Sequence, residues 1–352
     1  MRAVAFLSSL SAVSVMLAAA AHAAPVAGAG YTVTTFALGL AGTSGADSVE
    51  VFGGNVYIGY SNGTPKDGSG GTSTIAEYNA GGALLNSATV AGHNDGLRYD
   101  PTSGKLWSMQ NEDGNPNVML LTPGSLAKSS VLVFSAIPHG GGYDDALFTK
   151  GGAFLTASNP GKSPNTDPAL VSAVLSSGMV NVAGVLNGNA SATPLNAGAP
   201  TTLNLQDPDS LSLTQDGKLV LDSQGDGVLV FLTNPGTPAQ TAASLLLQAG
   251  VLVDDTVFAA GTEKTLLVAD KTTNIVYAIT GAFGFNIGYS AAQDAAGEGF
   301  VGALNADGSY SQMVTGLGNP GGEAFLVPEP ASVTMLGIGL LGLLGLRRRR
   351  AG

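Results

Sequence analysis

One feature constrains the fold of this chain more than any other: a pattern of short strands and tight turns recurs along most of its length. The pattern is clearest in residues 205–236, where three runs of strand-forming residues are separated by two turns, the first at Gln215-Asp216-Gly217. Such a segment is expected to form an antiparallel meander. The copies open with an aspartate and a short apolar run, at Asp47, Asp95, Asp145, Asp209 and Asp255.

The spacing of these aspartates predicts the architecture. Successive positions 47, 95, 145, 209 and 255 differ by 48, 50, 64 and 46 residues, close to the ~40–50 residues per blade of β-propellers. The longest interval contains 187–202, which is rich in Asn, Ala, Gly, Pro and Thr and which we interpret as an inserted loop. The sequence therefore predicts an all-β fold with a single β-propeller.

We expect six blades, with the ring closed by both ends of the repeat region. Residues 300–304, 310–315 and 323–327 are expected to form three strands of the last blade, and residues 31–38 the fourth. Joining the two ends within one blade would leave no open strand edge. A five- or seven-bladed ring and an irregular β-sandwich are the alternatives.

The first 23 residues have the features of a secretory signal peptide. Arg2 supplies a positive start, an apolar run follows, and Ala21-His22-Ala23 supplies small residues for cleavage after Ala23. The sequence contains no cysteine. An exported protein of this kind would have to be held together by buried sheet surface, without disulfides.

The charge balance excludes one class of partner. Five of the 14 basic residues are Arg2 and the four arginines at 347–350, so the rest of the chain carries 14 − 5 = 9 Lys and Arg against 25 Asp and Glu, a balance of 9 − 25 = −16. Such a surface repels phosphate backbones. Nucleic acid is therefore not an expected partner.

The last 25 residues combine three features in order. Pro328-Glu329-Pro330 comes first, residues 331–346 form an apolar run, and Arg347, Arg348, Arg349 and Arg350 form a basic tail. The apolar run is slightly shorter than the ~17–25 residues of an ordinary transmembrane helix, and flanking arginines can extend it. Because basic residues stay in the cytoplasm, the body would face the periplasm. A permanent tail anchor is the alternative.

This three-part tail resembles the PEP-CTERM sorting signal of Gram-negative bacteria. The resemblance implies an exosortase substrate, with Pro328, Glu329 and Pro330 as the recognised motif, 331–346 as a transient inner-membrane helix and the arginines as a retention signal. It implies exosortase and the secretion machinery as partners. It also implies release to the cell surface or the extracellular space, where exopolysaccharide and surface proteins are candidate partners.

Residues 47–327 resemble the six-bladed propellers of the NHL-repeat and gluconolactonase-like groups in their pattern of strands and turns. Such propellers include lactonases, esterases and binding modules, so the resemblance implies a fold without choosing a function. The expected organisation is a signal peptide at 1–23, a propeller domain at 31–327 and a sorting segment at 328–352.

The sequence offers no convincing set of catalytic residues. Thiol catalysis is excluded without cysteine, and only His93 and His139 remain after signal-peptide cleavage, which disfavours a multi-histidine zinc site. His93 precedes Asn94-Asp95, so one interpretation is a base near the mouth of the channel. The competing interpretation is a loop histidine that is hydrogen-bonded to backbone.

The five opening aspartates are the remaining candidates for a site. Propeller symmetry would bring Asp47, Asp95, Asp145, Asp209 and Asp255 to one mouth of the central channel, where converging carboxylates suit a metal such as Ca²⁺. The competing interpretation is that each aspartate binds backbone N–H groups in the turn that opens its own strand. The sequence favours an exported, non-catalytic binding or matrix protein over a calcium-dependent lactonase or esterase.

Overall fold

The computed structural model describes residues 23–136 and 141–326. Within these ranges the regular elements are strands, apart from one short 3-10 turn, η1 (Gln224–Asp226). No helix in these ranges is long and apolar enough to cross a membrane. The predicted signal peptide up to residue 22, the predicted helix at 331–346 and the predicted sorting residues 328–330 and 347–350 lie outside the described residues.

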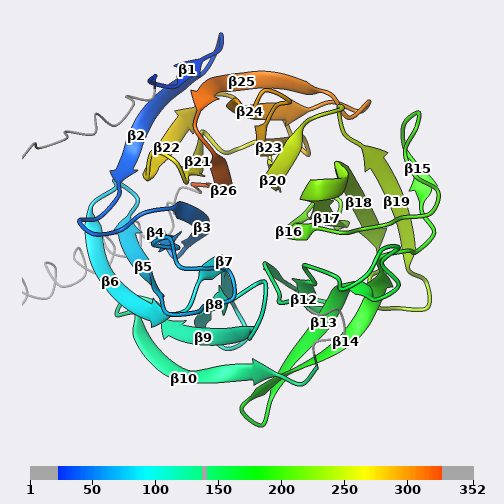
Figure 1. The fold of residues 1–352 in the computed structure, drawn as a ribbon. Coiled ribbons are helices and arrows are strands. Elements are labelled where there is room, and N and C mark those ends of the chain that lie inside the picture. Colours follow the sequence, from blue (N-terminus) through cyan, green and yellow to red (C-terminus); the bar gives the residue numbers. More distant parts are fainter. Residues whose placement is uncertain (1–22, 137–140, 327–352) are drawn as a thin grey trace, which may run out of the picture.

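The strands form five sheets set around a common centre, as Figure 1 shows. The first sheet contains β3 (Ala46–Phe52), β4 (Asn55–Tyr60), β5 (Thr72–Asn79) and β6 (Leu84–Ala91). The second sheet has eight strands: β7 (Asn94–Asp100), β8 (Lys105–Gln110), β9 (Asn117–Thr122), β10 (Ala127–Phe134), β11 (Ala146–Thr149), β12 (Gly152–Thr156), β13 (Pro168–Ser176) and β14 (Met179–Asn187).

The other three sheets complete the ring. The third contains β16 (Pro208–Leu213), β17 (Leu219–Ser223), β18 (Val228–Thr233), β19 (Thr241–Leu246) and the short β15 (Thr193–Pro194). The fourth contains β20 (Leu252–Phe258), β23 (Gly288–Gln293), β24 (Gly299–Leu304), β25 (Tyr310–Leu317) and the short β1 (Val26–Ala27). The fifth contains β26 (Pro320–Phe325), β21 (Thr265–Asp270), β22 (Ile275–Thr280) and β2 (Thr32–Leu38).

This arrangement is all-β and propeller-like, as predicted. Within each sheet the strands pair antiparallel in a series that runs outward from the centre, with two exceptions, in which β15 pairs parallel with β19 and β10 pairs parallel with β14. The β10–β14 contact covers only two residue pairs, Val133 with Met179 and Phe134 with Val180. It joins two four-stranded antiparallel runs into the eight-stranded sheet.

The predicted meander at 205–236 is confirmed as β16, β17 and β18, which pair antiparallel in sequence order. Its first turn contains Gly217 with φ of +86°, a conformation that glycine adopts without steric cost. Along β17 the side chains alternate between two apolar clusters, with Leu219 and Leu221 in one and Val220 in the other. Both faces of the strand are therefore buried, because each sheet packs between two neighbours.

The predicted composition of the last blade is wrong. Only β26 and β2 of the four predicted strands share a sheet, while β24 and β25 join β20 and β23 in the neighbouring one. The β21–β22 hairpin, which follows β20 in the chain, pairs instead between β26 and β2. The hairpin therefore crosses to the next sheet before the chain returns to complete the sheet of β20.

The apolar pattern of β21 explains why the sequence did not reveal this crossing. Leu266 and Val268 pack in one cluster, whereas Leu267 and Ala269 pack in another. A strand that is buried on both faces has a continuous apolar sequence. Such a sequence does not indicate which sheet the strand joins.

Candidate functional site

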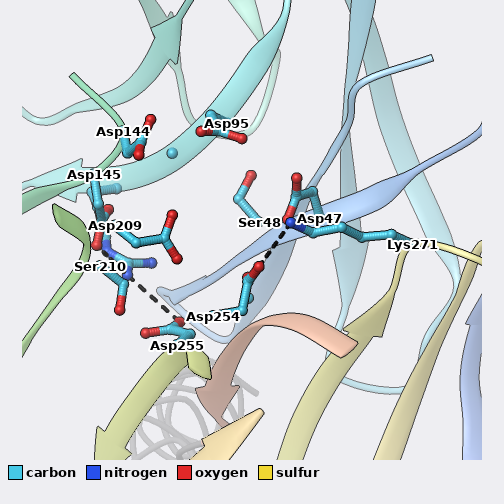
Figure 2. Close-up of a pocket in the computed structure, with 13 residues that line it drawn as sticks. Asp47, Ser48, Asp95, Asp144, Asp145, Asp209, Ser210, Asp254, Asp255 and Lys271 are labelled. Carbon is cyan, nitrogen blue, oxygen red and sulfur yellow. Dashed lines mark hydrogen bonds and ion pairs between the residues drawn. The ribbon is translucent and has the colours of Figure 1, made fainter. Parts of the chain in front are cut away.

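A pocket lies where the innermost strands begin, and we call it the central pocket. Figure 2 shows side chains from several strands directed into it. Its acidic lining residues are Asp47, Asp95, Asp144, Asp145, Asp209, Asp254 and Asp255, and its basic ones are Arg98 and Lys271. All five aspartates singled out in the sequence therefore line one pocket.

Irregular strand pairing positions these carboxylates. The pairing of the innermost strand with its neighbour shifts register between residues 46 and 49 in β3, 94 and 97 in β7, 208 and 211 in β16, and 253 and 255 in β20. Asp47, Asp95, Asp209 and Asp254 lie within these shifts. A β-bulge bends its strand and re-aims side chains. The irregularity in each of the four strands therefore turns its aspartate toward the pocket.

Two of the predicted aspartates connect neighbouring strands. Asp145 accepts hydrogen bonds from the backbone N–H of Ala146 at 2.7 Å and from that of Leu211 in β16 at 3.0 Å. Asp255 accepts in the same way from Thr256 at 2.8 Å and from Glu323 in β26 at 3.1 Å. The local half of each pattern is the backbone bond expected of a strand-opening aspartate. The other half fastens one innermost strand to the next.

Arg98 sits among these carboxylates. Its guanidinium nitrogen lies 2.8 Å from the Asp145 carboxylate and 3.8 Å from that of Asp255. Its side chain is 15% exposed. Arg98 also lines a second pocket together with Glu50 and Glu323, so it separates the central pocket from the space beyond it along the axis.

Lys271 follows β21 directly and reaches the opposite wall of the central pocket. Its ammonium nitrogen lies 2.9 Å from Asp47 and 2.9 Å from Asp254 (Figure 2). The five predicted aspartates therefore have different partners. Asp47 pairs with Lys271, whereas Asp145 and Asp255 bind backbone N–H groups and lie close to Arg98.

Burial and mutual repulsion hold several of these acids partly protonated near neutral pH. Burial raises the pKa of Asp47 to about 7 despite the opposing Lys271 charge, and burial raises that of Asp255 to about 6 despite Arg98. The pKa of Asp209 is well above its ordinary value because of burial and the charge of Asp254. The pKa of Asp95 is lowered, because hydrogen bonding led by His93 outweighs its burial.

The sequence prediction missed four charged members of the pocket. Asp144 and Asp254 each precede a predicted aspartate, and the doublets Asp144-Asp145 and Asp254-Asp255 were a visible signal. Arg98 and Lys271 had no such signal, because Arg98 meets Asp145 from 47 positions away and Lys271 comes from the crossing hairpin. Of the two histidines considered, His93 is hydrogen-bonded to backbone at Thr64, and His139 lies outside the described residues.

Comparison with known proteins identifies the tail. Residues 326–350 match the model of the PEP-CTERM protein-sorting motif. This match implies that the chain is exported as an exosortase substrate and is transiently anchored in the membrane through its C terminus. No curated protein matches the sequence significantly.

Solved structures resemble the body. A gluconolactonase of Xanthomonas campestris matches with a TM-score of 0.50 and 10% identity over 82% of this chain and 81% of that one. The periplasmic gluconolactonase of Pseudomonas aeruginosa matches with a TM-score of 0.45 and 14% identity over 81% and 89%. Virginiamycin B lyase from Staphylococcus aureus matches with a TM-score of 0.45 and 9% identity over 80% and 73%. At these identities the likeness concerns the fold alone.

Proposed function

We propose that this exported exosortase substrate acts at the cell surface or in the extracellular space as a non-catalytic binding protein. The observation that carries the proposal is the charge of the central pocket, where seven aspartates face two basic residues. Such a pocket attracts a positively charged group. An amino sugar of an exopolysaccharide or a basic side chain of a surface protein would supply one.

The proposed scaffold is a six-bladed propeller. Its support is the succession of neighbouring innermost strands, in which β3 contacts β7, β7 contacts β11, β11 contacts β16, β16 contacts β20, β20 contacts β26 and β26 contacts β3. The two runs joined by the β10–β14 contact then count as two blades. The domain proposed for this ring is residues 31–327, with the periplasm as the compartment in which it folds.

A binding experiment tests the proposed function. Calorimetry on the purified protein should show that oligomers of glucosamine bind, whereas N-acetylated oligomers of the same length, which lack the positive charge, do not. Binding should weaken with salt, and an Asp209→Asn variant should bind several-fold more weakly. Asp216→Asn is the matched control, because it removes the same charge from an exposed turn. Equal binding of charged and acetylated oligomers would contradict the proposal.

A hard cation is a second candidate for the same pocket, with Ca²⁺ as the expected ion and Asp47, Asp95, Asp145, Asp209 and Asp255 as proposed ligands. At free ion near 100 times its dissociation constant, binding would stabilise the fold by about 2.7 kcal/mol. Melting curves should then shift by several degrees between calcium and chelator. Identical midpoints would exclude this candidate.

A calcium-dependent lactonase or esterase is the catalytic alternative. A substrate screen separates it from the binding function. Metal-dependent hydrolysis that is lost in both Asp145→Asn and Asp209→Asn would replace the binding proposal with a hydrolase.

A further inference from the structure

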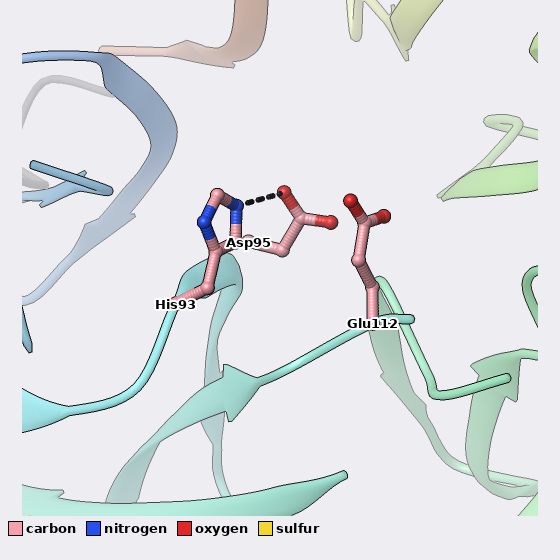
Figure 3. A group of neighbouring side chains, drawn as sticks. All are labelled: His93, Asp95 and Glu112. Atoms are coloured by element: carbon pink, nitrogen blue, oxygen red, sulfur yellow. Dashed lines mark ion pairs between the residues drawn. The ribbon is translucent and has the colours of Figure 1, made fainter. Parts of the chain in front are cut away.

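A cluster of different composition lies at one wall of the central pocket. One ligand atom from each of His93, Asp95 and Glu112 lies within 4.8 Å of the other two (Figure 3). His93 precedes β7, Asp95 belongs to β7, and Glu112 follows β8. Their side chains are 9%, 14% and 4% exposed. The antiparallel pairing of β7 with β8 brings the three together.

The hydrogen bond of His93 fixes the orientation of its ring. Its Nδ1 lies 2.6 Å from the backbone carbonyl of Thr64. Because a carbonyl only accepts, Nδ1 carries a proton and donates it. Nε2 faces the Asp95 carboxylate at 3.5 Å. When it is protonated it donates to Asp95, and once that proton is released it offers its lone pair to an ion. Histidines that bind metals share this arrangement, in which the distal nitrogen donates to a carbonyl.

The backbone around the cluster is tightly held. The side-chain oxygen of Asn111 accepts from the backbone N–H of His93 at 2.9 Å, and the backbone N–H of Asn111 donates to the carbonyl of His93 at 2.9 Å. Asn111 directly precedes Glu112. The segments that carry His93 and Glu112 are thus fixed to each other without any ion.

An independent observation points to a missing cation. Asp144 lines the central pocket beside Asp95, and the residue is 3% exposed. Neither of its carboxylate oxygens receives a hydrogen bond from an N–H or hydroxyl group that the structure describes, and its side-chain contacts are with the carboxyl groups of Glu112 and Asp95. A buried carboxyl without a donor is costly. Its strongest electrostatic neighbours are Glu112 and Asp95, so a cation held by those two residues would also serve Asp144.

We propose that His93, Asp95, Glu112 and Asp144 bind a divalent transition metal. An imidazole nitrogen with carboxylate oxygens suits ions such as Mn²⁺ and Zn²⁺, whereas Ca²⁺ takes oxygen ligands. The charges also balance, because three carboxylates are offset by the ion and by Lys66, which forms an ion pair with Glu112. The site differs from the calcium candidate, with which it shares only Asp95.

Titration with metals tests the proposal without any ligand for the central pocket. The purified protein, stripped with a chelator, should bind one Zn²⁺ or Mn²⁺ by calorimetry, with the bound Mn²⁺ visible by electron paramagnetic resonance. His93→Gln and Glu112→Gln should each weaken binding by more than about 10-fold, since even residues that only support a metal ligand contribute about 10–100-fold. Asp144→Asn should weaken it in the same direction.

Asp216→Asn is the matched control, because it removes the same charge from an exposed turn outside the pocket and should leave Zn²⁺ affinity within about 3-fold of wild type. Circular dichroism verifies the fold of each variant. The proposal is wrong if wild-type protein binds neither metal, or if His93→Gln binds as well as wild type. Loss of Zn²⁺ binding in Asp209→Asn alone would assign the metal to the five opening aspartates instead. These outcomes are independent of glucosamine binding.

Discussion

At the scale of the residue, Asp145 shows how one side chain combines a local and a distant role. Its hydrogen bond to Ala146 is the local bond that the sequence predicts for a strand-opening aspartate. Its other oxygen accepts from Leu211, 66 positions away, and from Arg98. The distant partners depend on how sheets are ordered around the centre, so no local pattern could reveal them.

Removing this carboxylate should destabilise the fold strongly. Asp145→Ala leaves two backbone N–H groups without their acceptor and Arg98 without its closest partner. The free energy of unfolding should fall by about 3 kcal/mol, because breaking a mostly buried ion pair leaves the charge of Arg98 buried and uncompensated. Chemical unfolding in the presence of chelator measures it. Asp216→Ala, which removes an exposed partner of Lys218, should cost under about 0.5 kcal/mol.

Buried acids should give this protein an unusual pH dependence. Burial raises the pKa of Glu50 to about 7 and that of Asp222 well above its ordinary value. A raised pKa means that the folded state holds a proton the unfolded chain has released. The resulting stability is full below the unfolded pKa near 4 and is lost as the pH rises toward 7. Melting temperatures should therefore rise from pH 8 to pH 5.

Asp222→Asn tests the cause of this trend. Both Asp222 oxygens lack a donor among the described residues, and the residue is 1% exposed. The amide cannot ionise, so the variant should lose part of the slope, up to about 1.4 kcal/mol per pH unit for one group. Asp216→Asn should keep the slope between pH 5 and 8, because the pKa of Asp216 is lowered. A wild-type protein that grows more stable toward pH 8 would contradict this prediction.

At the scale of the element, strands and turns were predictable, and their placement was less so. Alternating and β-branched residues revealed strands such as β18, and glycine revealed the turn at Gly217. The shifts in register that aim Asp47 and Asp209 were not visible, because a bulge adds a residue without changing composition. The crossing of β21 and β22 was hidden for a related reason, since both faces of β21 are apolar.

The closing strand β2 offers a test of this arrangement. Ala37 is 5% exposed and pairs with Val276 of the crossing hairpin. Ala37→Asp places a charge between buried apolar residues and should cost about 3 kcal/mol or more. Thr34→Asp makes the matched change at an exposed position of the same strand and should cost far less. Equal unfolding midpoints for the two variants would show that β2 does not close the ring.

At the scale of the whole molecule, export and sorting should be separable. Replacing Arg347, Arg348, Arg349 and Arg350 by Ser, or Pro328-Glu329-Pro330 by Ala, should leave export intact and block release from the inner membrane, because only the tail is altered. Fractionation into membrane, periplasm and medium measures the outcome. Release at the wild-type level would mean that the tail is a plain or dispensable anchor.

The crossing hairpin also sets the order in which an exported chain can fold. The N-terminal strand β2 pairs only with β22 in its sheet, and that sheet takes its innermost strand from β26, which ends at Phe325. The matched sorting motif begins at residue 326. In its sheet β2 can therefore pair only after β22 is available, and β26, the last strand before the sorting segment, completes the sheet. The strand that completes the fold is thus directly continuous with the sorting segment.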